Sequence, residues 1–354
     1  MGYRLSIEQR EFRFRFEART SRGPMPRRDV WLLRLTDTAT DREGWGEAAP
    51  LTGLSQESEE ETRLTLEGLV SKVASMDHRP EDFESWWRFL NPHAWPSSVR
   101  MAMEMAVRDL CSGGERKVFD SPFFDGQPIP INGLIWMGSP EFMWSQVLEK
   151  ISAGFTCLKL KVGGLRFEDE IELLAAIRRH PEGRSLTLRL DANGAFDPSD
   201  ALLKLERLTP FDIHSLEQPI RAGRVESMAH VCRNSPIPIA LDEELIGRFA
   251  MDEKVRLLEE TGARYLVLKP GLHGGFGETR EWISVAESLG QGWWITSALE
   301  SPVGLNAIAQ FTSTFGPTLP QGLGTGHIYE GTFQSPLVVE NGRIRYEKRL
   351  SWDF

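Results

Sequence analysis

The first fifty residues alternate between apolar and polar positions, as half-buried β-strands do. Phe12, Phe14 and Phe16 are separated by charged residues, which is the two-residue period of a strand with one buried face. Apolar residues then recur at helical spacing, so helices should follow the strands. The expected elements are strands over 12–16, 30–35 and 44–48 and helices over 57–75, 81–90 and 97–112. The pattern predicts a three-stranded antiparallel sheet followed by helices, an α+β unit.

From residue 130 onward, short apolar runs alternate with longer amphipathic stretches. Such alternation is typical of parallel strands that are connected by helices. The expected strands are 130–136, 156–162, 186–191, 213–217, 237–242, 265–269, 293–297 and 319–323, and the expected helices are 140–152, 168–180, 198–209, 223–233, 249–261, 277–289 and 302–314. Eight strands with seven intervening helices favour a closed α/β barrel of the TIM type, (β/α)7β. An open doubly wound sheet is the alternative, but residues 133–138 match its glycine-rich phosphate loop poorly.

These patterns divide the chain into two parts. Residues 1–125 form the expected α+β capping domain, with 112–127, rich in Gly, Ser, Asp and Pro, as the linker. Residues 126–325 form the expected barrel, the catalytic domain. Strand-like sequence returns over 328–352, so 326–354 are expected to complete the capping domain.

Composition narrows the classes of function. The chain has 354 residues, with 41 Lys and Arg against 51 Asp and Glu, a formal net charge of −10. An acidic chain is a poor nucleic-acid binder, because phosphate binding needs a basic surface. No run of about 18 apolar residues is present, so a membrane span is not expected. Three scattered cysteines argue against a disulfide framework, and a cytoplasmic location is expected. The oligomeric state is left open.

Polar residues stand at the ends of successive predicted barrel strands. The series is Lys161, Asp191, Glu217, Asp242, Lys269 and Ser297, with steps of 25 to 30 residues. A near-constant step of this size corresponds to one strand and one helix. Because active sites of such barrels form at the carboxyl ends of the strands, these side chains are expected to meet there.

The residue types in this series indicate a metal and a base. Asp191, Glu217 and Asp242 would repel one another unless a divalent cation neutralised them, and all-oxygen ligands suit Mg²⁺, with Mn²⁺ as the alternative. Lys159 and Lys161 share one face of their strand, so an ammonium and a metal should together lower the pKa of Lys161. A lysine of lowered pKa is able to act as a base near neutral pH.

Each of these residues has an ordinary structural explanation when it is taken alone. A Lys-x-Lys pair is usually a solvated strand face, and an Asp after a strand is most often a helix N-cap. The common spacing of the whole series is what favours the functional interpretation.

The motifs together resemble the enolase superfamily, and within it the muconate-lactonizing-enzyme subgroup. The resemblance covers nearly the whole chain. It rests on Leu158 to Gly163 (LKLKVG), Arg189 to Phe196 (RLDANGAF), Leu216 to Pro219 (LEQP), Ala240 to Glu243 (ALDE), Leu268 to Pro270 (LKP) and Thr296 to Ser301 (TSALES). With residues 322–326 (GLGTG), the chain looks most like the o-succinylbenzoate synthase family, the dehydratases of menaquinone biosynthesis.

The resemblance implies a syn dehydration with one base, acting on a small carboxylate, 2-succinyl-6-hydroxy-2,4-cyclohexadiene-1-carboxylate. Lys161 would remove the α-proton and return it to the leaving hydroxide, and Mg²⁺ on the three carboxylates would stabilise the enediolate. Lys269 would lie over the opposite face of the ring. The expected substrate contacts are Lys159, Ser297, Gly322, Leu323 and Gly324, and the expected supporting residues are Arg189, Asn193 and Glu243, the last of them paired with Lys269. Loops 21–28 and 51–57 would close over the substrate.

Two other functions remain open. An N-acylamino-acid racemase or dipeptide epimerase of the same subgroup needs two opposed lysines, and Lys161 and Lys269 are both present. Dipeptide epimerases typically carry an Asp-x-Asp near the eighth strand, and residues 322–326 contain none. A non-catalytic barrel that serves as a binding module is the alternative from another class, although no ligand or lysine of the series is missing.

Overall fold

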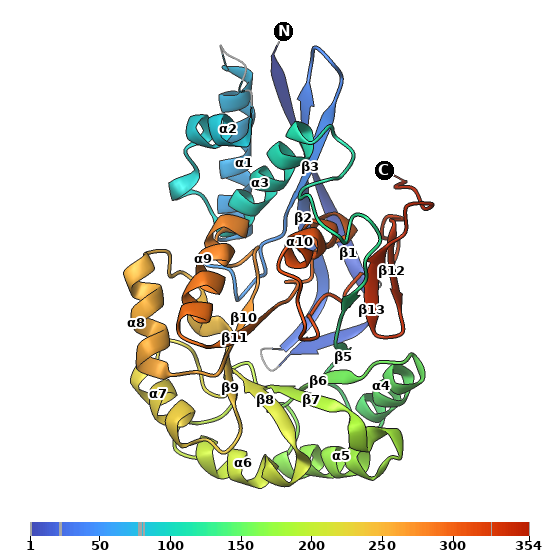
Figure 1. Ribbon diagram of the computed structural model, residues 1–354, viewed down its shortest axis with the longest axis vertical. Helices are drawn as coiled ribbons and strands as arrows, with labels where there is room; N and C mark the ends of the chain where they lie inside the picture. The colour runs from blue at the N-terminus through green and yellow to red at the C-terminus, as the bar shows by residue number, and fades with distance from the viewer. Residues whose placement is uncertain (1, 21–22, 77–79, 81, 327, 354) are drawn as a thin grey trace.

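The computed structural model describes residues 2–20, 23–76, 80, 82–326 and 328–353. An antiparallel sheet of β1 (Tyr3–Thr20), β2 (Gly23–Asp37) and β3 (Glu43–Ala48), in that order, begins the chain. The alternation predicted at 12–16 belongs to β1, which is longer than expected because its pairing with β2 continues from Tyr3 to Arg13 and again from Ala18. In Figure 1 this sheet rises above the curved parallel sheet, and β1 and β2 extend down to it.

Three helices pack beside the amino-terminal sheet, as the sequence predicted: α1 (Glu59–Ala74), α2 (Phe83–Leu90) and α3 (Ser97–Cys111). Two glycines of β3 explain how closely the buried α3 approaches the sheet. A side chain at Gly44 would collide with the backbone carbonyl of Ala106, and one at Gly46 with that of Ala102. Glycine at these two positions therefore sets the distance between α3 and the sheet.

The remainder of the chain forms a curved parallel sheet with helices outside it. Its strands, in spatial order, are β11 (Gly292–Ile295), β10 (Tyr265–Leu268), β9 (Ile239–Leu241), β8 (Ile213–Glu217), β7 (Thr187–Asp191), β6 (Cys157–Lys161) and β5 (Gly133–Ile135). The helices are α4 (Pro140–Ser152), α5 (Phe167–Arg179), α6 (Ala201–Leu208), α7 (Val225–Asn234), α8 (Met251–Thr261), α9 (Gly275–Ser288) and α10 (Pro302–Ser313). Short 3₁₀ turns lie at Pro92–Ala94, Glu182–Ser185, Thr209–Phe211 and Glu243–Leu245. The predicted barrel fold is confirmed.

The prediction of an eighth regular strand over 319–323 is wrong. This segment nevertheless hydrogen-bonds to both edges of the sheet. Gln321 donates its N–H to Pro130 O (2.8 Å), and Gly322 donates its N–H to Ile295 O (2.8 Å). Isolated bridges join Gln321 to Ile131 and Gly322 to Thr296, which closes the barrel. Pro320 has no N–H to donate, so a continuous ladder is interrupted here.

The carboxyl-terminal residues reach both parts of the molecule. The hairpin of β12 (Leu337–Glu340) and β13 (Arg343–Tyr346) pairs with β4 (Ile129–Pro130), which precedes the first barrel strand. Tyr329 instead forms a bridge with Phe14 of β1. The predicted domain division at residues 125 and 326 remains a prediction. Among the described residues, no helix is long and apolar enough to cross a membrane.

Candidate active site

Lys161, Asp191 and Glu217 lie side by side at the carboxyl ends of neighbouring strands. Lys161 of β6 pairs with Asp191 of β7, which in turn pairs with Glu217 of β8. Asp242 and Lys269 directly follow β9 and β10. The spacing of the series therefore does place these residues at one end of the barrel, as the sequence predicted.

Lys159 and Lys161 neutralise two buried carboxylates. Lys159 Nζ lies 2.9 Å from Asp191 Oδ2 and 2.7 Å from Glu217 Oε2. Lys161 Nζ lies 2.6 Å from Asp191 Oδ2. Both carboxyl groups are almost inaccessible to solvent, so these ion pairs form in a region of low dielectric constant, where an unpaired charge is costly.

Lys269 forms the third ion pair on the far side of the site. Its ammonium group contacts Asp242 Oδ2, and both side chains are buried. Three lysines thus face three carboxyl groups, and the formal charges of the cluster sum to zero. Such a cluster has the capacity to take up a divalent cation together with a dianion without a large net charge.

The pKa shifts separate the roles of the lysines. Burial, followed by repulsion from Lys159, lowers the pKa of Lys161. Burial acts in the same sense on Lys159, but the negative charges of Asp191 and Glu217 outweigh it and raise the pKa of that lysine. Lys161 is therefore the more easily deprotonated of the two, in the direction predicted. The main cause is burial rather than the neighbouring ammonium.

Asn193 connects Lys161 to Glu243. Its side-chain oxygen accepts a hydrogen bond from Lys161 Nζ (2.8 Å), and its side-chain nitrogen donates to Glu243 Oε1 (3.0 Å). The Asn193 backbone has a φ of 45°, in the left-handed region that asparagine tolerates better than most residues. Asparagine at this turn thus fixes the direction of the Lys161 ammonium.

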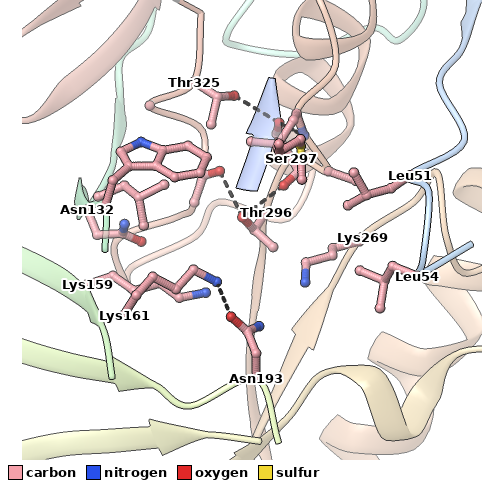
Figure 2. A pocket seen from close by; sticks show the side chains of 17 residues that line it. Leu51, Leu54, Asn132, Lys159, Lys161, Asn193, Lys269, Thr296, Ser297 and Thr325 are labelled. Atoms are coloured by element: carbon pink, nitrogen blue, oxygen red, sulfur yellow. Dashed lines mark hydrogen bonds between the residues drawn. The ribbon is translucent and has the colours of Figure 1, made fainter. Parts of the chain in front are cut away.

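A pocket lies above these lysines. Figure 2 shows Lys159 and Lys161 on one side of it and Lys269 on the other. The far wall carries Ser297, whose hydroxyl lies 2.8 Å from the hydroxyl of Thr325. The lining residues are Met25, Leu51, Leu54, Asn132, Leu134, Trp136, Lys159, Lys161, Asn193, Lys269, Thr296, Ser297, Ala298, Leu299, Gly322, Gly324 and Thr325. A carboxylate bound between the lysines would leave the rest of its molecule against this mixed polar and apolar wall.

The family model described as "Enolase C-terminal domain-like" matches residues 143–350, more than half of the chain. The chain belongs to the enolase superfamily. The family resemblance stated for the motifs is thereby confirmed.

Relatives within the superfamily include several activities. An o-succinylbenzoate synthase of Desulfotalea psychrophila is 40% identical over 97% of this chain and 99% of the relative. An N-succinylamino acid racemase of Amycolatopsis sp is 27% identical over 92% of this chain and 87% of the relative.

Two solved structures of the superfamily share the fold. The crystal structure of MenC from Desulfotalea psychrophila LSv54 has a TM-score of 0.85 and 38% identity, covering 98% of this chain and 100% of that one. A dipeptide epimerase of Enterococcus faecalis, complexed with Mg and the dipeptide L-Leu-L-Tyr, has a TM-score of 0.81 and covers 98% of this chain and 97% of its own. At 20% identity, the second likeness concerns the fold alone.

Three carboxyl groups close together at one end of the barrel have the chemistry of a site for a divalent cation. The described residues contain no group of three acidic, His or Cys side chains already arranged to hold a metal ion. The carboxylates of the cluster are paired with ammonium groups instead. Asp242 nevertheless has a buried oxygen, Oδ1, with no hydrogen-bond partner. Burial and the charges of Asp191 and Asp242 raise the pKa of Glu217, so a cation here would relieve their repulsion. All-oxygen ligands of this kind suit Mg²⁺.

Two of the predicted site residues, Leu323 and Arg189, do not line the pocket. Leu323 has its side chain in the hydrophobic core and is not among the residues that line the pocket, so the predicted contact of its backbone with a substrate stays a prediction. Arg189 also lies away from the pocket. Its guanidinium stacks 3.9 Å from the Trp294 ring and donates to Pro320 O (2.7 Å).

Lys269 was expected to pair with Glu243, but its ion pair is with Asp242. Asp242 directly follows β9, whereas Glu243 begins the 3₁₀ turn Glu243–Leu245. Glu243 still takes part in the site through Asn193.

The two predicted capping loops contribute to the pocket. Met25, Leu51 and Leu54 line it, whereas Ser21 and Arg22 of the first loop lie outside the described residues. Asn132 and Thr325 also line the pocket and were not predicted as site residues. Asn132 lies within the predicted strand 130–136, and Thr325 follows the predicted strand 319–323, so position near a barrel strand is the signal that could have indicated them.

Proposed function

We propose that the chain is an o-succinylbenzoate synthase, a lyase that dehydrates 2-succinyl-6-hydroxy-2,4-cyclohexadiene-1-carboxylate to 2-succinylbenzoate, in menaquinone biosynthesis. The similarity to the synthase of Desulfotalea psychrophila over nearly the full length of both chains carries this proposal. The three lysines around one pocket support it, because the substrate has two carboxylates and an acidic α-proton.

Substrate binding would replace contacts within the cluster. The ring carboxylate would lie between Lys159 and the buried carboxylates, with the ring between Lys161 and Lys269. Asp191, Glu217 and Asp242 would hold the Mg²⁺ ion. When bound, this ion supplies positive charge that stabilises the substrate carboxylate as the α-proton leaves.

Lys161 would carry the proton through both steps. As a neutral amine, it takes the proton from the carbon next to the ring carboxylate, and the electron pair of that C–H bond moves toward the carboxylate. The electron pair then returns to the ring, the C–O bond to the hydroxyl breaks, and the Lys161 ammonium gives its proton to the departing oxygen. Water leaves, and the ring becomes aromatic. Burial, which lowers the pKa of Lys161, favours the neutral amine that begins this sequence.

The other lysine would act without proton transfer. Lys269 lies on the opposite side of the pocket, where its positive charge would rest against the face of the ring (Figure 2). Ser297 and the backbone of Gly322 and Gly324 would hold the succinyl arm, since all three line the far wall.

A second candidate is an N-succinylamino-acid racemase. The opposed positions of Lys161 and Lys269 favour it, because racemisation needs an acid–base group on each face of the substrate, and the Amycolatopsis relative has this activity in its name.

One experiment separates the candidates. The purified protein with Mg²⁺ is given the cyclohexadiene substrate, and the loss of the diene absorbance is followed; N-succinylamino acids are tested in parallel by polarimetry. Rapid dehydration is expected. Racemisation without dehydration would contradict the proposal, and the absence of both would support the non-catalytic alternative.

A further inference from the structure

The loop that follows β11 forms one wall of the pocket in an unfavourable backbone conformation. Ser297, Ala298 and Leu299 of this loop all line the pocket. Leu299 has a φ of 68°, in the left-handed region, which a leucine rarely adopts. Such a conformation persists when the surrounding structure holds it.

Side chains from outside the barrel strands hold the carbonyl groups of this loop. Tyr329 donates its hydroxyl to Leu299 O at 2.6 Å. Arg28 of β2 donates to Ala298 O at 3.3 Å. Both side chains are buried, with 1% and 3% of their surfaces exposed, so these hydrogen bonds do not compete freely with water.

A third side chain anchors the end of the same loop. Glu47 of β3 accepts hydrogen bonds from the backbone N–H of Ser301 (2.8 Å), the Ser301 hydroxyl (2.6 Å) and the N–H of Gly304 (2.8 Å). The carboxylate is completely buried at the beginning of α10. It fixes the point at which the loop enters the helix, so the strain at Leu299 cannot be relieved by a shift of the loop end.

Arg28 also reaches the second capping loop. The same guanidinium donates to Ala49 O (2.8 Å) and Pro50 O (2.5 Å), immediately before Leu51, which lines the pocket. One side chain thus joins the pocket wall of the barrel to the pocket wall of the amino-terminal part.

We propose that Arg28 and Tyr329 are positioning residues for the pocket, because they hold residues 297–301 in the strained conformation that shapes its wall. The affinity for the part of the substrate beyond the lysines then depends on the amino-terminal sheet and on the segment around Tyr329, although neither of the two side chains lines the pocket. This inference rests on the proposed function only because the kinetic assay uses the cyclohexadiene substrate.

The kinetic test uses Tyr329→Phe and Arg28→Met. Tyr329→Phe loses one buried hydrogen bond and should raise KM about two- to tenfold, and Arg28→Met, which loses three, should raise it at least as much. In both variants kcat should change less than about twofold, because Lys161 and the carboxylates are untouched. Arg28→Lys should restore part of the KM effect. Arg166→Met, at an exposed arginine that pairs with Asp169, is the matched control and should leave KM unchanged.

Relief of the strain distinguishes a positioning role from a general loss of stability. Glycine adopts a φ near 68° without penalty, so in a Leu299→Gly background the Tyr329→Phe and Arg28→Met changes should raise KM less than in the wild type. The comparison is a double-mutant cycle, in which the direct effect of losing the leucine side chain cancels. Ala298→Gly is the matched control, since it adds flexibility at a neighbouring pocket residue whose φ is not positive. An equal reduction by Ala298→Gly would overturn the proposal.

Amide hydrogen exchange tests the proposal without any substrate. We call the hydrogen bonds from Arg28 to Ala298 O and from Tyr329 to Leu299 O the clamp. The amides of residues 298–301 should exchange faster in both variants than in the wild type, and Leu299→Gly should reduce that difference. If the protein dehydrates nothing but these amides respond as expected, the proposed function fails and the clamp stands. Unchanged exchange together with unchanged KM overturns the clamp. Tyr329→Phe removes a single oxygen atom, so it carries the test if Arg28→Met does not fold.

Discussion

Lys161 and Asp191 stand opposite each other on adjacent parallel strands, and Lys161 Nζ lies 2.6 Å from Asp191 Oδ2. This pairing places the candidate base directly beside a candidate metal ligand. A cation bound by Asp191 would weaken the hold of that carboxylate on the ammonium, so metal binding and deprotonation of the lysine are expected to favour each other.

Replacement of Lys161 tests its role as the base. Lys161→Ala should lower kcat by about two to four orders of magnitude, because general acid–base groups contribute on that scale. The measurement is the initial rate of dehydration. Lys348→Ala, at an exposed lysine paired with Asp125, should keep full activity. Substantial turnover by Lys161→Ala would remove this lysine from the mechanism.

Replacement of Lys269 distinguishes a charge from an acid–base group. Lys269→Arg keeps a cation near Asp242 but cannot exchange a proton at neutral pH, whereas Lys269→Met removes the charge. If the lysine supplies only charge, the dehydration rate of Lys269→Arg should be about tenfold or more above that of Lys269→Met. Equal loss in both variants would instead indicate proton transfer at this position, as a racemase requires.

Metal removal should abolish turnover and lower stability. Excess chelator is expected to stop dehydration, and added Mg²⁺ should restore it. Mg²⁺ should also raise the melting temperature of the wild type, because a ligand that binds only the folded state stabilises it. Asp242→Asn should weaken that rise in melting temperature. A melting temperature that does not respond to Mg²⁺ would argue against a metal-binding site formed by these carboxylates.

Glu300 should make stability depend on pH. Burial, together with the charge of Glu47, raises the pKa of Glu300 to about 7 in the folded state. The folded protein therefore keeps a proton that the unfolded chain loses near pH 4.5, so the free energy of unfolding should fall as the pH rises from about 4.5 to about 7 and level off above that.

Glu300→Gln should remove this pH dependence. Urea unfolding should show similar stability for the variant and the wild type at about pH 4, and a variant that is more stable by about 2–3 kcal/mol at about pH 8.5. Glu206→Gln, on an exposed part of α6, serves as the control. Parallel pH profiles for the wild type and Glu300→Gln would contradict the assignment.

The candidate lysines and carboxylates, and the end of the barrel at which they lie, could be predicted from the sequence alone. The near-constant step from Lys161 through Lys269 corresponds to one strand and one helix, so the side chains had to emerge at the same end of successive strands. The two-residue period placed Lys159 on the same face as Lys161. These are local properties of strands and their connections, so the pattern of apolar and polar residues is enough to predict them.

Which of these side chains contact one another depends on the tertiary structure and could not be predicted from the sequence. Lys269 contacts Asp242 rather than Glu243, and Leu323 lies in the core while Thr325 reaches the pocket. The pocket wall at Leu299 depends on Tyr329, and both arise from segments without a regular strand. Contacts of this kind join residues distant in the sequence, and their geometry follows from how the sheet closes and how the amino-terminal part packs on it. The local pattern of apolar and polar residues does not predict that packing.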